Sequence, residues 1–500
     1  MENEPANSSK GDRLASGSVF IFGSIVAARI ATILSSIVIV RVLGPKDYGV
    51  LSIIILTISL AAITASFQIP SALVKFLAAA HADKTQDANR LLGAAFLMTL
   101  VSTVITVTVL AMLSPVLALN LYHEPRVQGL LLVALVSLVL SALTSPLFSV
   151  FQAFERIKEL GVRSAVAALL TIPSTLLLVL LFGLEGAVVA MVVNAGISIL
   201  VNVALLRAIW RARNLKLEMP REGHVYRRLL GYATPAFANA TMVSVLLWFC
   251  GTQFAAREWY LELGRYSAGY GLASYVLFIT SAVGVPLIPI VSKLDRHNPE
   301  QMSHFMARTI RVGSLLTLLP TLVFVAMPEP FLRILYGNSY VGASNVVRLV
   351  APAVFLASVT GLVGYGLAGT GQMKSAFALN LTWVIPVAIL SVLLIPTWRE
   401  NGLALAILAA YVIHFSATLV FAKMAWSVAL SRLTAPMLIA FISLPTAAFI
   451  SFYSSAPRLV LSSILLSGVI IAGLLVLTNR ELEVLSQPLR KVFSRIHARH

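Results

Sequence analysis

The sequence predicts an all-α polytopic membrane protein with about 14 transmembrane helices. Of the 500 residues, 58% are hydrophobic and only 11% are charged, and the mean hydropathy is +0.90. Soluble domains carry about a quarter charged residues. Apolar runs of about 20 residues recur along nearly the whole chain, and each is long enough to cross the hydrocarbon core of a bilayer. No polar stretch between the runs is long enough to form a soluble domain, so we expect a single membrane-embedded unit.

The apolar runs give the order of the predicted helices directly. The fourteen ranges are 18–41, 50–69, 91–113, 127–150, 164–182, 187–206, 232–255, 266–291, 305–327, 346–368, 376–395, 403–422, 433–452 and 460–477. The first run is too long for a cleavable signal peptide and has the wrong flanks, so it is expected to remain as the first helix.

The basic residues orient these helices. With an even number of helices both termini lie on one side, and that side receives 27 of the 37 Lys and Arg, against 9 on the other side and Arg29 inside the first helix. Lys and Arg collect in cytoplasmic loops, so both termini are predicted to be cytoplasmic. The net charge of +17 is therefore an orientation signal and does not indicate nucleic-acid binding.

A weak internal repeat divides the chain. Five pairs of residues recur in the same order at offsets of 213 to 220: Gly44 and Gly264, Pro70 and Pro286, Lys158 and Lys374, Pro173 and Pro386, and Gly186 and Gly402. They indicate a duplicated six-helix unit, with the two copies related by a parallel pseudo-two-fold axis along the membrane normal. Two lobes of this kind are typical of transporters that work by alternating access, with substrate between the lobes near the bilayer midplane.

The repeat sets the predicted domain boundaries. These are a cytoplasmic tail over 1–17, an N-terminal lobe over 18–206, a basic cytoplasmic linker over 207–231, a C-terminal lobe over 232–422, two additional helices over 423–477 and a basic cytoplasmic tail over 478–500.

Arg29 is the most informative single residue. It lies close to the middle of the first helix, where a charge costs at least about 2.5 kcal/mol on insertion scales and is a functional candidate by default. Thr32 and Ser36 extend a polar stripe from it, which we expect to face a water-filled cavity. The alternative is an Arg that satisfies backbone carbonyls structurally.

Other polar groups at bilayer depth are candidates for glycan contacts. Asn194, Ser198 and Asn202 share one helix face because they are spaced by four residues, and Asn239, Trp248 and Gln253 lie on the seventh predicted helix. Hydrogen bonding between helices is the alternative for the five polar side chains, whereas Trp248 could stack on a sugar face. No Asp or Glu lies near the centre of a predicted helix, so the cavity is expected to be positive. A diphosphate held by a guanidinium is the natural anionic ligand.

Signatures of catalytic sites are missing from the sequence. There is no Walker A motif, no Gly-x-Ser-x-Gly, no His-Glu-x-x-His and no Cys-x-x-Cys, and these are common signatures of ATP-driven, hydrolytic and metal-dependent chemistry. The single cysteine, Cys250, excludes an intramolecular disulfide. We therefore expect a transporter rather than an enzyme, with no cofactor and no metal.

Several stretches resemble the polysaccharide biosynthesis flippase family of the multidrug, oligosaccharidyl-lipid and polysaccharide exporter superfamily. The first is Arg41-Val-Leu-Gly-Pro-Lys-Asp-Tyr-Gly-Val-Leu-Ser, and Pro70-Ser-Ala-Leu-Val-Lys-Phe and Leu229-Leu-Gly-Tyr-Ala-Thr-Pro continue the likeness. The resemblance implies a two-lobed bundle that moves a polyprenyl-diphosphate oligosaccharide from the cytoplasmic to the outer leaflet. It also implies a basic central cavity for the diphosphate, and Arg29 stands where that role is expected.

The sequence therefore predicts a lipid-linked oligosaccharide flippase in the plasma membrane of a prokaryote. Its expected partners are the polyprenyl-linked glycan, membrane lipids and a glycan polymerase or glycosyltransferases, with no nucleic acid. One alternative is a cation-coupled drug or small-molecule exporter of the same superfamily, which would require a buried carboxylate in the first lobe. The other is a membrane glycan polymerase or glycosyltransferase, which usually needs a larger external loop than any here.

Overall fold

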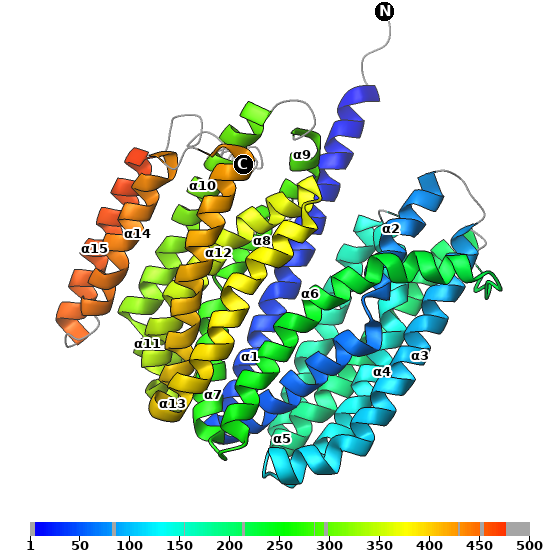
Figure 1. Ribbon diagram of the computed structural model, residues 1–500, viewed down its shortest axis with the longest axis horizontal. Coiled ribbons are helices and arrows are strands. Elements are labelled where there is room, and N and C mark those ends of the chain that lie inside the picture. The colour runs from blue at the N-terminus through cyan, green and yellow to red at the C-terminus, as the bar shows by residue number, and fades with distance from the viewer. Residues whose placement is uncertain are drawn as a thin grey trace, which may run out of the picture. The chain divides into compact units, whose positions relative to one another are not determined.

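The computed structural model describes the backbone of residues 6–82, 87–154, 156–212, 216–284, 286–294, 299–428, 431–450 and 455–476, and every regular element in these ranges is helical. Figure 1 shows the helices in chain order. The α-helices are α1 (Ala6–Ser66), α2 (Ile69–Ala82), α3 (Asp87–Val116), α4 (Arg126–Ala153), α5 (Ile157–Ala212), α6 (Gly223–Ala255), α7 (Tyr260–Ser274), α8 (Leu277–Gly284), α9 (Leu287–Leu294), α10 (Pro299–Ala326), α11 (Pro328–Tyr336), α12 (Ser344–Thr370), α13 (Met373–Trp426), α14 (Ser431–Ile450) and α15 (Ser455–Val476). A π-helical turn, η1, covers Leu117–Leu121, and a 3₁₀ turn, η2, covers Asn338–Ala343.

Within the described residues, eight helices are long and apolar enough to cross a membrane, or up to nine if a bent pair counts as one span. The multi-pass character expected from composition is confirmed by these helices, whereas the number fourteen stays a prediction. Three of the long helices contain a non-helical residue, at Gly44, Gly183 and Arg399, where the sequence predicts the boundary between two spans.

The chain reverses direction at two of these residues. A Cβ atom on Gly186 would lie 1.9 Å from the carbonyl oxygen of Leu178, and one on Gly402 would lie 2.1 Å from that of Leu394. Residues eight apart in a straight helix are about 12 Å apart along its axis. Such contacts therefore require tight helical hairpins in α5 and α13.

The two hairpin turns are alike and lie 216 residues apart. Gly183 has φ 54° and ψ −123°, and Arg399 has φ 48° and ψ −127°. An arginine rarely takes a positive φ, because its Cβ atom crowds the backbone there. The matching conformations support the predicted repeat at the same offset as Gly186 and Gly402, and the repeat itself stays a prediction.

The described chain divides into two compact units, residues 1–264 and 265–500. In unit 1, α1 packs against α3, α4, α5 and α6. A buried core cluster joins α2 to α6 and includes Leu73, Leu92, Phe151 and Leu229. The unit thus includes α6, which the sequence assigns to the second lobe, and the predicted lobe boundaries stay predictions.

The Leu43-Gly44-Pro45 stretch of unit 1 explains why this motif has its residue types. Gly44 takes φ 69° and ψ 171°, a conformation that an L side chain rarely adopts. Pro45 follows at the start of the next helical segment, where its missing N–H costs nothing. The Asp47 carboxylate then lies 3.4 Å from the Arg126 guanidinium at the start of α4. The motif is therefore a turn together with its attachment to α4.

Gly49 permits a close helix crossing, and we expect Gly49→Ala to destabilise unit 1. A Cβ atom there would lie 1.9 Å from the backbone oxygen of Tyr260, so α1 and α7 would have to separate. Overpacking of this kind typically costs about 1–3 kcal/mol. Thermal unfolding of purified protein would measure the loss. Gly129→Ala is the matched control, because none of the described residues comes within 4 Å of a Cβ atom there, and equal melting of the two variants would contradict the close crossing.

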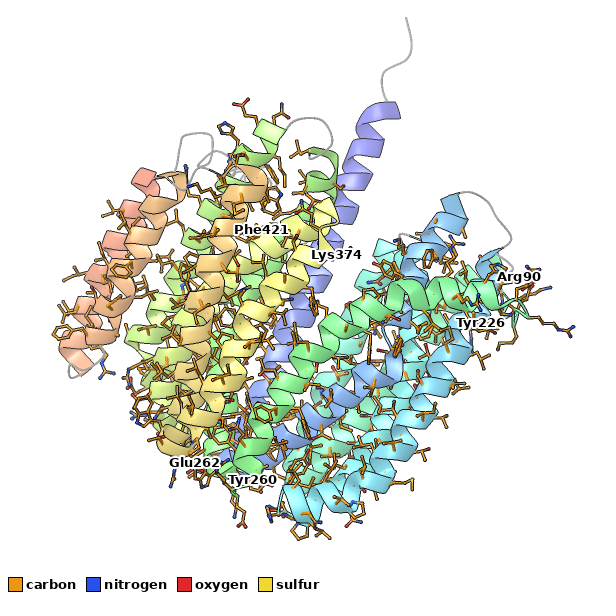
Figure 2. The ribbon with its side chains drawn as sticks, viewed as in Figure 1. Arg90, Tyr226, Tyr260, Glu262, Lys374 and Phe421 are labelled. Carbon is orange, nitrogen blue, oxygen red and sulfur yellow. The ribbon has the colours of Figure 1, made fainter. Side chains whose placement is uncertain are left out.

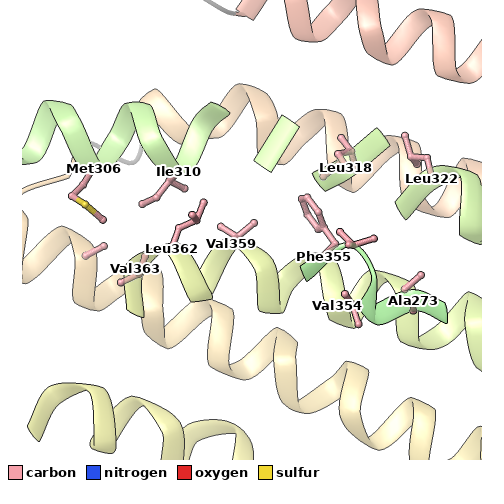
Figure 3. Packing of buried hydrophobic residues seen from close by; sticks show 14 of the residues in the cluster. Ala273, Met306, Ile310, Leu318, Leu322, Val354, Phe355, Val359, Leu362 and Val363 are labelled. Atoms are coloured by element: carbon pink, nitrogen blue, oxygen red, sulfur yellow. The ribbon is translucent and has the colours of Figure 1, made fainter. Parts of the chain in front are cut away.

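Unit 2 is built around α10 and α12. Figure 3 shows Met306, Ile310 and Leu318 of α10 interleaved with Phe355 and Leu362 of α12. The helices α14 and α15 pack against each other and against α10, and lie side by side in Figure 1. Burial of these apolar side chains holds the helices in place.

The predicted eighth helix, 266–291, is wrong as a single helix. The structure divides this stretch among α7, α8 and α9, with a bend of 41° between α7 and α8. Pro286 directly precedes α9. Proline has no backbone N–H and its ring clashes with the preceding turn, so it ends or kinks a helix. The proline is visible in the sequence, but hydropathy alone does not register the break that it makes.

Candidate functional site

The polar stripe on the first predicted helix is only partly described. The Arg29 side chain lies outside the described part of the chain, although its backbone belongs to α1. Thr32 is exposed and Ser36 is half-buried, and the Ser36 hydroxyl donates to the Ile33 carbonyl at 2.8 Å. The role assigned to Arg29, Thr32 and Ser36 stays a prediction.

Asn194 ties together the two halves of the α5 hairpin. Its Oδ1 accepts a hydrogen bond from Ser174 Oγ at 3.0 Å, and its Nδ2 donates to Thr175 Oγ1, also at 3.0 Å. These are the hydrogen bonds between helices that were the alternative for Asn194, and its contact with a substrate stays a prediction. An amide bridge of this kind fixes the register of the hairpin.

Further along the same helix face, Asn202 accepts a hydrogen bond from the guanidinium group of Arg163. Asn202 is fully buried, and its Oδ1 accepts a hydrogen bond from Arg163 Nε at 2.9 Å. The Asn202 Nδ2 group donates to the Ser198 carbonyl at 2.7 Å. The guanidinium carbon of Arg163 lies 4.6 Å from the ring centroid of Phe148 on α4, within the range of a cation–π interaction. Asn202 and Phe148 together fix a half-buried guanidinium inside unit 1.

The sequence alone does not single out Arg163, because this residue falls among the basic residues at the predicted cytoplasmic ends of the helices. The signal lies in the hairpin. Residues at similar distances before and after a tight turn face each other in an antiparallel pair, and Arg163 and Asn202 lie 20 and 19 residues from Gly183. Locating the turn at Gly183 would have paired Arg163 with Asn202.

The structure places Trp248 in a different cluster. Trp248 Nε1 donates to the hydroxyl of Tyr122 at 2.9 Å, and Thr57 Oγ1 lies 2.8 Å from the same hydroxyl. The Tyr260 hydroxyl donates to the Tyr122 carbonyl at 2.5 Å, and Figure 2 shows Tyr260 at the start of α7. Trp248 therefore contributes to the packing of unit 1 and is engaged by Tyr122.

Burial and a neighbouring charge set the protonation of two side chains in the turn before α4, Tyr122 and Glu124. Burial raises the pKa of the Tyr122 hydroxyl, so it stays protonated and can act as a donor. The hydrogen bond from Arg126 lowers the pKa of the Glu124 carboxyl. This carboxylate contributes stability above its unfolded pKa, and the contribution is lost as the pH falls through the folded pKa.

The two remaining predicted residues lie on α6. Asn239 and Gln253 are both half-buried, and both take part in polar contacts. The described contacts join Asn202 and Ser198 with Arg163, and they do not bring Asn239, Trp248 or Gln253 to that group. The predicted set is therefore divided among at least two places in unit 1.

The Arg163 group has the chemistry of an anion site. No carboxylate in the described part of the chain forms an ion pair with Arg163, and only its Nε is used by Asn202. The two terminal nitrogens of a guanidinium form a fork that matches phosphate oxygens. The described residues contain no group of three or more His, Cys, Asp and Glu that could hold a metal.

Solved structures of membrane transporters share this fold. A lipid II flippase MurJ in an inward closed conformation matches with a TM-score of 0.68 and 14% identity, covering 95% of this chain and 100% of that one. An inward-facing multidrug resistance MATE transporter of the MOP superfamily matches with a TM-score of 0.64 and 13% identity over 80% of this chain and 94% of that one. At these identities the likeness establishes the fold alone.

A third structure of the same kind is the MATE multidrug transporter DinF-BH. It has a TM-score of 0.58 and 18% identity, and covers 81% of this chain and 95% of that one. The comparison with curated protein sequences found no significant match.

The sequence itself matches a family model over more than half of its length. The model is described as polysaccharide biosynthesis protein, and the match runs over residues 14–295. This range contains the turn at Gly44, the α5 hairpin and the Arg163 group, and it confirms the resemblance seen in the sequence. The chain therefore belongs to the polysaccharide biosynthesis protein family.

Proposed function

We infer that this protein is a flippase that carries a polyprenyl-diphosphate-linked oligosaccharide from the cytoplasmic to the outer leaflet. The observation that supports this most directly is the Arg163 guanidinium, which Asn202 and the Phe148 ring hold in place without a paired carboxylate among the described residues. A diphosphate is the part of such a substrate that a fixed guanidinium recognises. Membership of the polysaccharide biosynthesis family favours a glycan as the remainder.

The mechanism we infer is alternating access between two lobes, with the polar head crossing through the protein while the lipid tail stays in hydrocarbon. Unit 2 carries an apolar groove of about 640 Å³ whose lining includes Phe355, Phe415 and Phe441, a surface suited to a polyprenyl chain. An inside-negative potential would favour outward movement of the anionic head by about 2.3 kcal/mol per charge per 100 mV.

The function is tested by reconstitution. Purified protein in proteoliposomes is expected to translocate a fluorescent polyprenyl-diphosphate oligosaccharide, measured as label that becomes accessible to a reagent on the opposite side. Liposomes with an inactive multi-pass protein at the same density are the control for leakage. Failure of the wild-type protein with several glycans would refute the flippase.

Arg29 is tested in the same assay. If its side chain meets the diphosphate, Arg29→Ala is expected to reduce translocation at least about tenfold at matched insertion, because a charge-assisted hydrogen bond typically contributes about 1.5–3 kcal/mol. Arg13→Ala, in the predicted cytoplasmic tail, is the control. Equal rates for wild type and Arg29→Ala would assign a structural role to Arg29.

The alternative is a drug exporter of the same superfamily. Its support is the fold shared with multidrug transporters. An exporter of organic cations favours a carboxylate in its cavity, and the Arg163 group has the opposite charge. Uptake of the cationic dye rhodamine 6G into inverted vesicles, with no movement of the lipid-linked glycan, would decide for the exporter.

A further inference from the structure

Unit 2 contains a polar pocket that the Arg163 group does not involve. It has a volume of about 330 Å³ and lies between α12 and the two halves of the α13 hairpin; its lining includes Thr360, Gly364, Asn380, Trp383, Tyr411 and His414. This volume is within the range of about 300–1,000 Å³ that is usual for small-molecule sites. The pocket is therefore large enough to be a ligand site.

His414 offers a hydrogen-bond acceptor to this pocket. The imidazole is buried, and its Nδ1 lies 3.0 Å from the Leu379 carbonyl and 2.9 Å from Thr382 Oγ1. The Thr382 hydroxyl already donates to the same carbonyl at 2.7 Å. A carbonyl can only accept, so Nδ1 carries the proton, and in the neutral ring Nε2 is then an acceptor.

Two aromatic rings form an apolar wall beside the imidazole. The Trp383 and Tyr411 rings are stacked, with centroids 5.5 Å apart and an interplanar angle of 16°. The Tyr411 ring also meets the His414 ring edge to face at 5.9 Å. Trp383 Nε1 donates to Asn380 Oδ1 at 3.4 Å, which orients the amide. The pocket thus combines a rigid aromatic surface with neutral hydrogen-bonding groups.

The chemistry of the lining narrows the ligand to an uncharged one. Apart from the imidazole, the described residues that line this pocket carry no acidic or basic side chain. A diphosphate would lack a cationic partner there, and an organic cation would lack a carboxylate. A sugar ring has an apolar face of C–H groups and a rim of hydroxyls, so it matches an aromatic wall beside Asn, Thr and His side chains.

In unit 1 an aromatic side chain occupies the position that corresponds to Gly364 of this pocket. At the offset of 216 residues that relates Gly183 to Arg399, Gly364 corresponds to Phe148, His414 to Ser198 and Thr418 to Asn202. In unit 1 the Phe148 ring lies under the Arg163 guanidinium. In unit 2 no atom of the described residues lies within 4 Å of a Cβ atom on Gly364. The same position therefore carries a ring in one unit and open space in the other.

We propose that the pocket between α12 and α13 binds one uncharged sugar unit of the transported glycan, through the Trp383 and Tyr411 wall, the His414 imidazole and the Asn380 amide. The proposal rests on the proposed flippase function for the identity of the substrate. Lys374 and Phe421, near the first and last turns of α13, lie at the same end of unit 2 in Figure 2. The charge asymmetry predicts this end to be cytoplasmic, the side from which a flippase collects its substrate.

The test measures sugar binding without transport. Protein in nanodiscs is titrated with two neutral probes, tritiated N,N′-diacetylchitobiose and tritiated maltose, and binding is followed by scintillation proximity. We expect saturable binding of at least one probe. Gly364→Phe supplies the ring that unit 1 has at this place and is expected to weaken binding at least about tenfold.

Two further variants make the test specific. Gly468→Phe on α15 is the matched control, because a Cβ atom there also meets no described atom within 4 Å, and its binding should equal that of wild type. His414→Phe keeps a ring against Tyr411 but removes both nitrogens. It should weaken sugar binding, and it should lower thermal stability less than a substitution that leaves a cavity at this position.

Each outcome separates this proposal from the flippase function. Saturable sugar binding without translocation would uphold the pocket and refute the flippase. Translocation of the lipid-linked glycan without saturable binding of either probe, or with binding equal in Gly364→Phe and Gly468→Phe, would overturn the pocket. Saturable binding of rhodamine 6G that Gly364→Phe abolishes would also overturn it, since the occupant would then be an organic cation.

Discussion

Glu329→Ala is expected to lower the free energy of unfolding by about 3 kcal/mol, the lower end of the usual cost of removing one member of a buried ionic group, because this group is only partly buried. The Glu329 carboxylate on α11 is bonded to Arg348 on α12, and its other oxygen lies 2.7 Å from Arg458 on α15. The three side chains are only 15–22% exposed. Removing the carboxylate takes away the anion that the Arg348 and Arg458 guanidinium groups share.

Thermal unfolding in detergent, followed by loss of monodisperse protein on size exclusion, measures this effect. The control is Glu300→Ala. The Glu300 side chain is 87% exposed and its carboxylate lies 3.8 Å from the His304 imidazole, and an exposed pair of this kind contributes about 0–1 kcal/mol. If Glu329→Ala melts with the wild type, the three charges do not hold α11, α12 and α15 together.

Arg163→Ala is expected to reduce translocation of the lipid-linked glycan by about ten- to a hundredfold. Hydrogen bonds to charged groups contribute about 1.5–3 kcal/mol, and in this variant the diphosphate would lose the guanidinium fork. Arg163→Lys should retain part of the activity, because an ammonium keeps the charge but not the planar pair of donors. The rate is measured in proteoliposomes at equal protein density.

The matched control for Arg163 is Arg156→Ala. Arg156 precedes the same helix, is 45% exposed and forms an ion pair with Glu159 at 2.8 Å, so its removal should leave translocation unchanged. Thermal unfolding of both variants distinguishes a functional loss from a folding defect, since Asn202 is buried and loses a donor in Arg163→Ala. Rates that fall equally in Arg163→Ala and Arg156→Ala would assign the effect to general positive charge.

Hydropathy is enough to predict the helical membrane fold. Each span must satisfy its backbone N–H and C=O groups within its own helix and be apolar over about 20 residues. The turns between the spans are harder to predict from the sequence. Gly44 could be read as a boundary, but Arg399 turns the chain in a conformation that its residue type disfavours. Pro286 marks the break before α9 in the sequence. The packing of α9 against α12 is a contact between distant residues, which a local sequence pattern does not show.

The candidate site was predicted only in part. The shared face of Ser198 and Asn202 followed from helical spacing, whereas their contact with Arg163 depends on where the chain turns between them. Phe148 gave no signal at all, since a phenylalanine in an apolar helix looks like any core residue. The pocket around His414 was missed for a related reason: it depends on Gly364 having no side chain, and an empty volume leaves no trace in hydropathy.

The α5 hairpin also has a consequence for biosynthesis. Arg163 and its partner Asn202 are separated by 39 residues, and ribosomes add about 5–20 residues per second. The arginine is therefore made about 2–8 seconds before the amide that receives its hydrogen bond. During that interval the nascent helix carries an uncompensated charge, which favours holding it at the aqueous edge of the insertion machinery until the second half of the hairpin arrives and both halves enter the lipid as a pair.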